Sequence, residues 1–277
     1  MKKLVLVIAI AAIFVTGSMV YAGQFGPPEP AAKEGKVALG IGYFHYSAKS
    51  KPKDTVAGVV STAGDTVNWD EGKGTSNQAY LQLGYGFTKN WEAYLRVGGA
   101  DSKAKDAFYT GAYSAGFKSD FNDGYKPFGT IGVKGVFNVT PSFGIGPFFQ
   151  ATLSSSYKDS TSGTLEGYSV TQEVKVNNPR EINLGVGLQG KIGDVIIYGG
   201  PVAYWAKHKA EWTGKVVGAT WAVTGTDTLA FSTTYKEKNN IGGFAGVRVP
   251  LGKGLSLEVE GQMKSKFSMG GALTYSF

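Results

Sequence analysis

Residues 79–97 read AYLQLGYGFTKNWEAYLRV, which is two alternating runs joined by a short turn. In the first run Leu81, Leu83 and Tyr85 alternate with Gln82 and small residues, and the second run repeats the pattern. A period of two places successive side chains on opposite faces of a β-strand, so each run has one apolar face. A three-residue turn lets the two runs pair. This stretch therefore predicts an antiparallel hairpin.

Strands of this kind recur from Lys36 to the end of the chain, and no convincing amphipathic helix interrupts them. Together with 79–87 and 91–97, the runs cover residues 36–44, 130–137, 143–153, 181–192, 195–208, 241–251, 255–264 and 267–277. Residues 195–208 are apolar on both faces, so the alternation does not assign their register. Ten strands are predicted, mostly of the 9–11 residues that a tilted membrane strand needs.

Short and long connections alternate between these strands. The short turns are residues 88–90, 138–142, 193–194 and 252–254, and the long polar connections are 50–76, 101–127, 158–179 and 209–239. In a closed up-and-down barrel, all the short turns then lie at one rim and the long loops at the other, as in bacterial outer-membrane barrels. Within the fourth long connection, 215–223 and 228–235 are strand-like. We expect them to extend the neighbouring strands as a hairpin; counting them as spanning strands gives twelve.

Composition excludes several other classes of protein. The 277 residues include 41 glycines and 31 Phe or Tyr residues but no cysteine, and 18% are charged. Disorder is excluded by the aromatic and β-branched content, and a disulfide or zinc-thiolate scaffold by the absence of cysteine. Only one apolar run approaches the length of a membrane-spanning helix.

That run is at the start of the chain. Lys2 and Lys3 precede an apolar stretch over residues 4–15, and small residues at 20–22 suit a signal peptidase. We expect a signal peptide over 1–22 that directs Sec export and is cleaved after Ala22; an uncleaved anchor is the alternative. Removal of both lysines lowers the net charge from +7 to +5. Residues 23–35 contain three prolines and no periodicity, and are expected to be a periplasmic lead-in to a barrel over 36–277.

The two faces of the strands favour a barrel in a membrane over a soluble secreted barrel. Aromatic residues gather at the strand ends, as the girdles of membrane barrels do. The predicted girdle comprises Phe87, Trp91, Phe137 and Phe143 near the short turns and Tyr43 and Trp205 near the opposite rim. The predicted polar interior comprises Glu92, Arg96, Lys134, Glu181, Lys191, Arg248, Glu258 and Glu260. The expected fold is an all-β, closed antiparallel up-and-down transmembrane barrel of about ten strands, with eight or twelve as alternatives.

The last five residues resemble a known signal. Leu273, Tyr275 and Phe277 alternate with polar residues, and Phe277 ends the chain. This is similar to the C-terminal β-signal of small Gram-negative outer-membrane β-barrel proteins, the porin-like and OmpA-like barrels. The resemblance implies insertion by the barrel-assembly machinery into the outer membrane, with lipid and lipopolysaccharide as neighbours. Nucleic acid is excluded as a partner by compartment, and the sequence does not indicate the oligomeric state.

Few residues suggest chemistry. His45 and Ser47 share the outward parity of their strand and resemble the His-x-Ser pair of lipid A deacylase barrels, but they lie on the first strand rather than near the C-terminus. No outward acid is available to orient His45. His208 lies between two lysines, which disfavours a metal ion, and the calcium-like run from Asp120 lacks the required glutamate. No catalytic, metal or cofactor site is therefore predicted.

The predicted function is a non-enzymatic outer-membrane barrel with a structural or surface-binding role through long extracellular loops. We expect interior charges to pair across strands as a polar plug, Arg96 with Glu92 and Arg248 with Glu258 or Glu260, because unpaired buried charges are costly. A narrow porin for small polar solutes is the main alternative, since ten strands leave room for a small pore. A lipid A-modifying enzyme is the weaker one.

Overall fold

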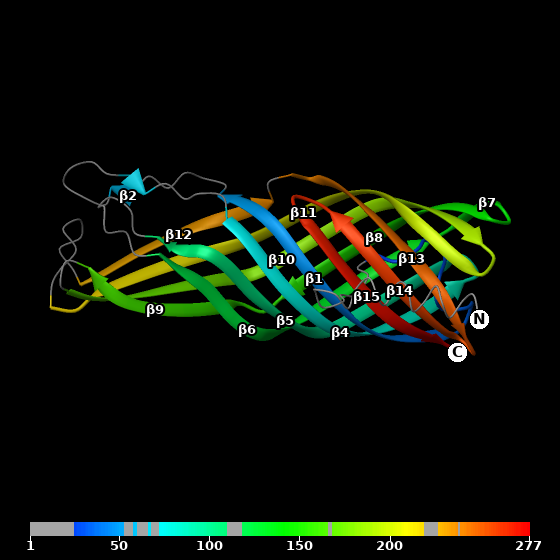
Figure 1. Cartoon of the computed structure of the whole chain (residues 1–277), viewed down its shortest axis with the longest axis horizontal. Coiled ribbons are helices and arrows are strands. Elements are labelled where there is room, and N and C mark those ends of the chain that lie inside the picture. The colour runs from blue at the N-terminus through cyan, green and yellow to red at the C-terminus, as the bar shows by residue number, and fades with distance from the viewer. Residues whose placement is uncertain are drawn as a thin grey trace.

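The structure is a computed structural model that describes residues 25–52, 58–59, 66–67, 72–109, 118–165, 168–218, 227–237 and 239–277 (Figure 1). The predicted signal peptide, residues 1–22, lies outside the described residues. All the long elements are β-strands. Among the described residues, no helix is long and apolar enough to cross a membrane.

The strands follow one another in the predicted order. In the first half of the chain they are β1 (Val37–Pro52), β2 (Gly58–Val59), β3 (Thr66–Val67), β4 (Gly72–Thr88), β5 (Trp91–Tyr109), β6 (Lys118–Gly135) and β7 (Phe137–Thr140). In the second half they are β8 (Phe143–Ser154), β9 (Tyr157–Leu165), β10 (Tyr168–Ile192), β11 (Val195–Val216), β12 (Thr228–Glu237), β13 (Ile241–Gly252), β14 (Leu255–Met263) and β15 (Phe267–Ser276).

Ten of these strands form a closed antiparallel ring. The hydrogen-bonded order is β1-β4-β5-β6-β8-β10-β11-β13-β14-β15, and β15 returns to β1. The closing pair runs from Ala38 opposite Ser276 to His45 opposite Met269. Each strand pairs with its sequence neighbours, which confirms the up-and-down barrel of about ten strands. The tight turns, β7 and the C-terminus lie at one end, which we call the inner end.

The opposite, outer end differs from the prediction. Most of the described residues in the expected long loops lie in strands. β10 alone has 25 residues, β9 pairs with Tyr168–Val176 of β10, and β12 pairs with both β11 and β1. The wall continues because Phe121, Tyr157, Val174 and Trp212 form a buried cluster beyond the predicted strand ends. Of the strand-like run predicted at 215–223, residues 219–223 lie outside the described residues, and 215–216 are the end of β11. The second predicted run, 228–235, lies in β12, which pairs with β11 and extends the wall. The ring closes with ten strands without counting β12, rather than with the alternative twelve.

The outer surface of the ring carries the apolar faces. Exposed large apolar side chains include Leu81, Leu83, Leu95, Ile131, Leu184 and Ile197. Four aromatic residues of the predicted girdle are also exposed on this surface: Phe87, Phe137, Phe143 and Trp205. Trp91 lies edge-on to Phe137, with ring centroids 5.9 Å apart, and Tyr43 is half-buried. Leu273, Tyr275 and Phe277 of the C-terminal alternation also lie on this exposed face.

The inner surface is aromatic as well as polar. Phe44, Tyr80 and Phe128 form one buried cluster inside the ring. A second cluster consists of Phe25, Phe148, Ile196, Tyr198, Val202 and Phe244. This second cluster explains why residues 195–208 are apolar on both faces. Even-numbered residues of β11 such as Tyr198 face the lumen, while Ile197 and Trp205 are exposed outside.

Candidate functional site in the barrel lumen

The described N-terminal segment, residues 25–36, folds into the inner end of the lumen. Phe25 is 1% exposed and lies between the rings of Phe148 and Phe244. The centroid of its ring is 4.6 Å from that of Phe148 and 5.1 Å from that of Phe244. Pro27 is also fully buried. From Phe25 the chain descends to the inner rim, where Glu34 bridges to Gly86, and then enters β1. The expected periplasmic lead-in is therefore placed inside the barrel, and we call residues 25–36 the plug segment.

Two buried carboxylates hold the backbone of the plug segment. Glu260, on β14, accepts hydrogen bonds from the amide N–H groups of Phe25 and Gly26, at 3.1 and 2.8 Å. Glu92, on β5, accepts from those of Ala31 and Ala32, at 2.5 and 2.9 Å. Both glutamates are fully buried. Their charge is offset by backbone donors that a segment without regular structure would otherwise leave unsatisfied.

Glu29 fixes the middle of the plug segment. Its backbone N–H donates to the Gln189 side chain at 2.7 Å, and its carboxylate accepts from the same amide at 3.0 Å. The carboxylate also pairs with Lys191 at 2.5 Å, and its carbonyl oxygen accepts from Arg248 at 3.0 Å. Lys191, predicted to face the interior, thus lies at the inner mouth with Glu29 as its partner.

Two glycines make room for the segment. Gly26 has φ +73°, and a Cβ there would lie 3.0 Å from both Glu258 Oε2 and Lys134 Nζ. Gly86, on β4, has the carbonyl oxygens of Lys33 and Ala32 where a side chain would start, at 2.3 and 2.6 Å from an added Cβ. At Gly86 a larger residue would displace the segment, because only glycine allows so close a backbone approach. At Gly26 the constraint is the positive φ, which side chains other than glycine rarely adopt.

The interior charges form one expected ion pair and one unexpected arrangement. Arg248 Nε donates to Glu258 Oε1 at 2.6 Å, and both side chains are buried. Arg96 Nε donates to the Gln82 side chain at 2.7 Å, and the guanidinium carbon of Arg96 lies 4.7 Å from the Tyr94 ring centroid. Glu92, its predicted partner, binds the plug segment instead.

A third group of polar residues ties the outer half of the lumen together. Lys264 Nζ, on a fully buried side chain, donates to Glu181 and, at 2.8 Å, to the Asn183 side chain. Glu181 also accepts from the Tyr46 hydroxyl at 2.9 Å. These residues come from three separate parts of the ring: Tyr46 lies on β1, Glu181 and Asn183 lie on β10, and Lys264 follows β14. Ring centroids of Tyr204, Phe25 and Tyr46 lie 5.1–5.5 Å from the ammonium group.

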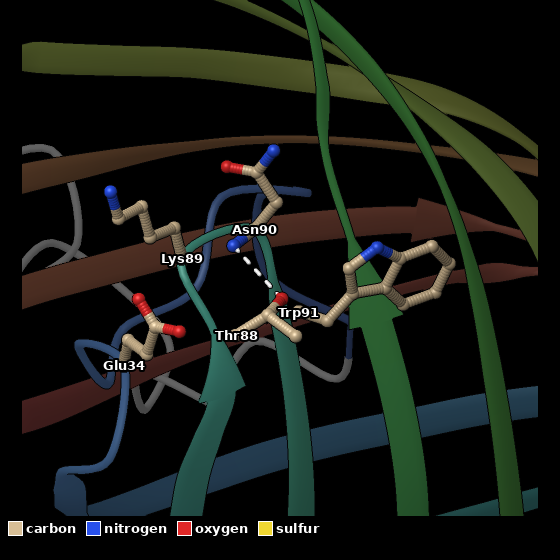
Figure 2. Close-up of a pocket in the computed structure, with 5 residues that line it drawn as sticks. All are labelled: Glu34, Thr88, Lys89, Asn90 and Trp91. Carbon is tan, nitrogen blue, oxygen red and sulfur yellow. Dashed lines mark hydrogen bonds between the residues drawn. The ribbon is translucent and has the colours of Figure 1, made fainter.

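One small cavity lies among the described side chains of the lumen. A cavity next to Phe44, Tyr80, Arg96 and Gln150 measures about 10 Å³, which is about the space of one water molecule. A shallow hollow lies at the inner rim, where Glu34 meets the β4–β5 turn (Figure 2). The Asn90 N–H donates to Thr88 Oγ1 there, at 3.3 Å, and Lys89 and Trp91 complete the lining.

His45 and Ser47 differ from each other in their surroundings. His45 Nδ1 lies 3.0 Å from Asn77 Oδ1, and the Asn77 amide donates to Asp101 at 2.9 Å. Ser47, expected to face outward, is only 7% exposed. At this point β1 has separated from β15, and the Ser268 hydroxyl bridges the backbone N–H and C=O of Ser47, at 2.9 and 3.2 Å. The structure thus assigns Ser47 a place in the wall.

Within the described part of the chain, no group of three or more His, Asp or Glu residues could hold a metal ion. His208 lies on the outer extension of β11, where its ring stacks on Tyr235 with centroids 5.3 Å apart. Asp123 of the calcium-like run accepts a hydrogen bond from the Lys158 N–H at 2.7 Å and pairs with Lys126 at 3.3 Å. These residues contribute to the packing of the outer wall.

The sequence alone did not identify the plug segment as part of the site. Phe44, Tyr80, Tyr94 and Phe244 fall on the polar parity of their strands, which is a visible sign that the interior holds aromatic packing. Nothing local in residues 25–36 indicates their partners, because Glu92 lies 60–61 residues and Glu260 234–235 residues further along the chain.

No family model and no curated protein matches the chain. Among solved structures, it is similar to the outer membrane protease OmpT from Escherichia coli, at 9% identity and TM-score 0.45, over 92% of this chain and 99% of that one. It is also similar to the translocator domain of the autotransporter NalP from Neisseria meningitidis, at 11% identity and TM-score 0.41, over 97% of this chain and 92% of that one. A third similar structure is the outer membrane protein OprG from Pseudomonas aeruginosa, at 8% identity and TM-score 0.29, over 89% of this chain and 98% of that one. The names of the first two proteins describe different functions, a protease and a translocator, so no activity of these proteins is assigned to this chain.

Proposed function

We propose that the protein is a non-enzymatic, integral outer-membrane barrel whose lumen is closed at the inner end by its own N-terminal segment. The outer wall then serves a structural or surface-binding role. The observation that carries this proposal is the burial of Phe25 inside the ring, with Glu260 and Glu92 bound to the backbone of the plug segment. A closed lumen suits a scaffold better than a channel.

The membrane location is supported by the exposed apolar faces of the ring and by the exposed aromatics at its ends. In lipid, every strand needs hydrogen-bonding partners on both sides, which a closed ring provides. Export by the Sec route and cleavage after Ala22 belong to the same proposal, as does insertion by the barrel-assembly machinery.

Planar-bilayer recording tests the closed lumen. The chain without its signal peptide should give no steady unitary conductance at neutral pH, whereas a variant lacking residues 25–34 should conduct, because the deletion removes the groups that fill the inner end. Both proteins are first checked for heat-modifiable migration, so that only folded barrels are compared.

Steady conductance by the undeleted protein would overturn the closed lumen and favour the alternative, a narrow porin. A silent deletion variant that still migrates as a folded barrel would show that side chains such as Arg96 and Lys264 suffice to close the lumen. The plug segment would then have no role in closure.

A further inference from the structure

A row of cations crosses the outer surface of the barrel. Arg180 on β10 is directly opposite Lys207 on β11, and Lys207 is directly opposite Lys236 on β12. The side chains of all three are exposed. Lys51 occupies the next register position, on β1. We call Arg180, Lys207 and Lys236 the cationic row.

Such a row costs stability by itself. Residues directly opposite each other in an antiparallel pair have Cβ atoms about 4.5–5.5 Å apart, and like charges at this distance destabilise the sheet. Among the described residues, no carboxylate pairs with Arg180, Lys207 or Lys236. An anion between these side chains would turn the repulsion into attraction.

Other lysines of the outer wall do have acidic partners. Lys209 pairs with Glu211 at 2.8 Å, and Lys158 pairs with Glu173 at 2.7 Å. Lys215 lies 3.7 Å from Asp227. The cationic row is thus distinguished from the general basic character of the wall by its position and by its lack of described acidic partners.

The position of the row indicates what kind of anion it meets. Trp205 and Ile182 are opposite each other and exposed, and each lies two residues from the row on the same face, toward the apolar surface. Leu153, opposite Arg180, is also exposed and apolar. The row therefore lies at the edge of the apolar surface, at the depth where the headgroups of surrounding lipid begin.

We propose that the cationic row binds the phosphate groups of an anionic, phosphorylated lipid whose acyl chains lie against Trp205, Ile182 and Leu153. Arginine forms two parallel hydrogen bonds with a phosphate, and lysine acts as a point charge beside it. The inference rests on the proposed membrane location, but it does not depend on whether the lumen conducts.

Lipid binding by the folded protein tests the proposal. Purified lipid A, a phosphorylated glycolipid, is titrated into the protein in zwitterionic detergent, and bound lipid is counted by native mass spectrometry. The double variant Lys207→Gln/Lys236→Gln should bind it more weakly, by about 5-fold for each lysine removed. The matched control Lys158→Gln/Lys209→Gln loses the same charge from paired lysines and should bind as the unaltered protein does.

The unfolding temperature is a second test, because the difference between the row variant and the unaltered protein should change sign when lipid A is added. In zwitterionic detergent alone, the row variant should unfold at a higher temperature than the unaltered protein, because a like-charge contact is relieved. With lipid A present, the order should reverse. A structural role of these lysines would give the same order in both conditions.

Equal lipid binding by the row variant and the unaltered protein would overturn the proposal, as would an equal loss in the control variant. Inorganic phosphate is the second probe. If it binds with the same dependence on Lys207 and Lys236 while lipid A does not bind, the lipid assignment is wrong. Loss of heat-modifiable migration, or protein that stays soluble without detergent, would instead contradict the proposed membrane location.

Discussion

At the scale of single residues, Arg248 and Glu258 show what the lumen requires of its charges. Removing one partner of a buried ion pair leaves the other charge uncompensated. Arg248→Met should therefore destabilise the barrel by about 3–5 kcal/mol, measured by urea unfolding in lipid vesicles. The double variant Arg248→Met/Glu258→Leu should recover most of this loss. Equal destabilisation of both variants would show that the ion pair is not the source.

His208 gives the outer wall a pH dependence. Burial lowers the pKa of His208 from 6.5 to about 4. The folded state therefore keeps His208 neutral between these values while the unfolded chain binds a proton, so stability falls as the pH falls from about 6.5 toward 4. Hydrogen exchange of β12 amides, corrected for intrinsic rates, should be faster at the lower pH. His208→Phe should remove this difference, and an unchanged difference would assign it to other groups.

His45 tests the absence of catalysis. Its Nδ1 contact with Asn77 orients the ring, but Ser47 is buried and its backbone is bound by Ser268. His45→Ala should leave the lipid A profile of cells expressing the protein unchanged, as seen by mass spectrometry of extracted lipid. A modified lipid that is present with the unaltered protein and absent with the variant would contradict the proposed non-enzymatic role.

At the scale of an element, the plug segment depends on a space on β4. A side chain at Gly86 would occupy the position of the Lys33 carbonyl, so Gly86→Val should expel the segment and open the lumen in bilayer recordings. Gly190→Ala is the matched control, because an added Cβ there meets nothing within 4 Å. Conductance from the control, or none from Gly86→Val, would contradict this description.

Elements also differ in how far the sequence predicts them. Leu81, Leu83 and Tyr85 alternate cleanly because one side of β4 is apolar and the other is not, so the hairpin at 79–97 follows from local pattern alone. The outer part of β10 was expected to be loop, although Val170 and Val174 keep the strand period there. The plug segment has no period, and only contacts with distant strands determine its path.

At the scale of the whole molecule, the apolar outer face determines where the barrel can reside. Leu83 lies four residues from either end of the run 79–87 and is exposed. Leu83→Arg should cost about 2–4 kcal/mol in lipid-vesicle unfolding, and Ile192→Arg, at the inner rim, only about 0–1 kcal/mol. Equal costs at both positions would contradict a membrane centred on this surface.

The charges inside the barrel were predictable as a set but not in their pairing. Parity places Glu92, Arg96, Glu258 and Glu260 on one face, and the structure buries all four. Which donor each one binds depends on the three-dimensional path of residues 25–36. The two glutamates that hold this path, Glu92 and Glu260, bind backbone N–H groups of the plug segment, which the parity of the strands does not predict.

The carboxylate of Glu260 also constrains the order of assembly. Phe25 and Gly26 precede all the wall strands in the chain, yet the group that holds them belongs to β14, 234–235 positions later. The Arg248 and Gln189 contacts of Glu29 likewise wait for β13 and β10. Such long-range contacts pay their loop-closure entropy first and form late. We therefore expect the plug segment to take its final place last, after the wall around it is complete.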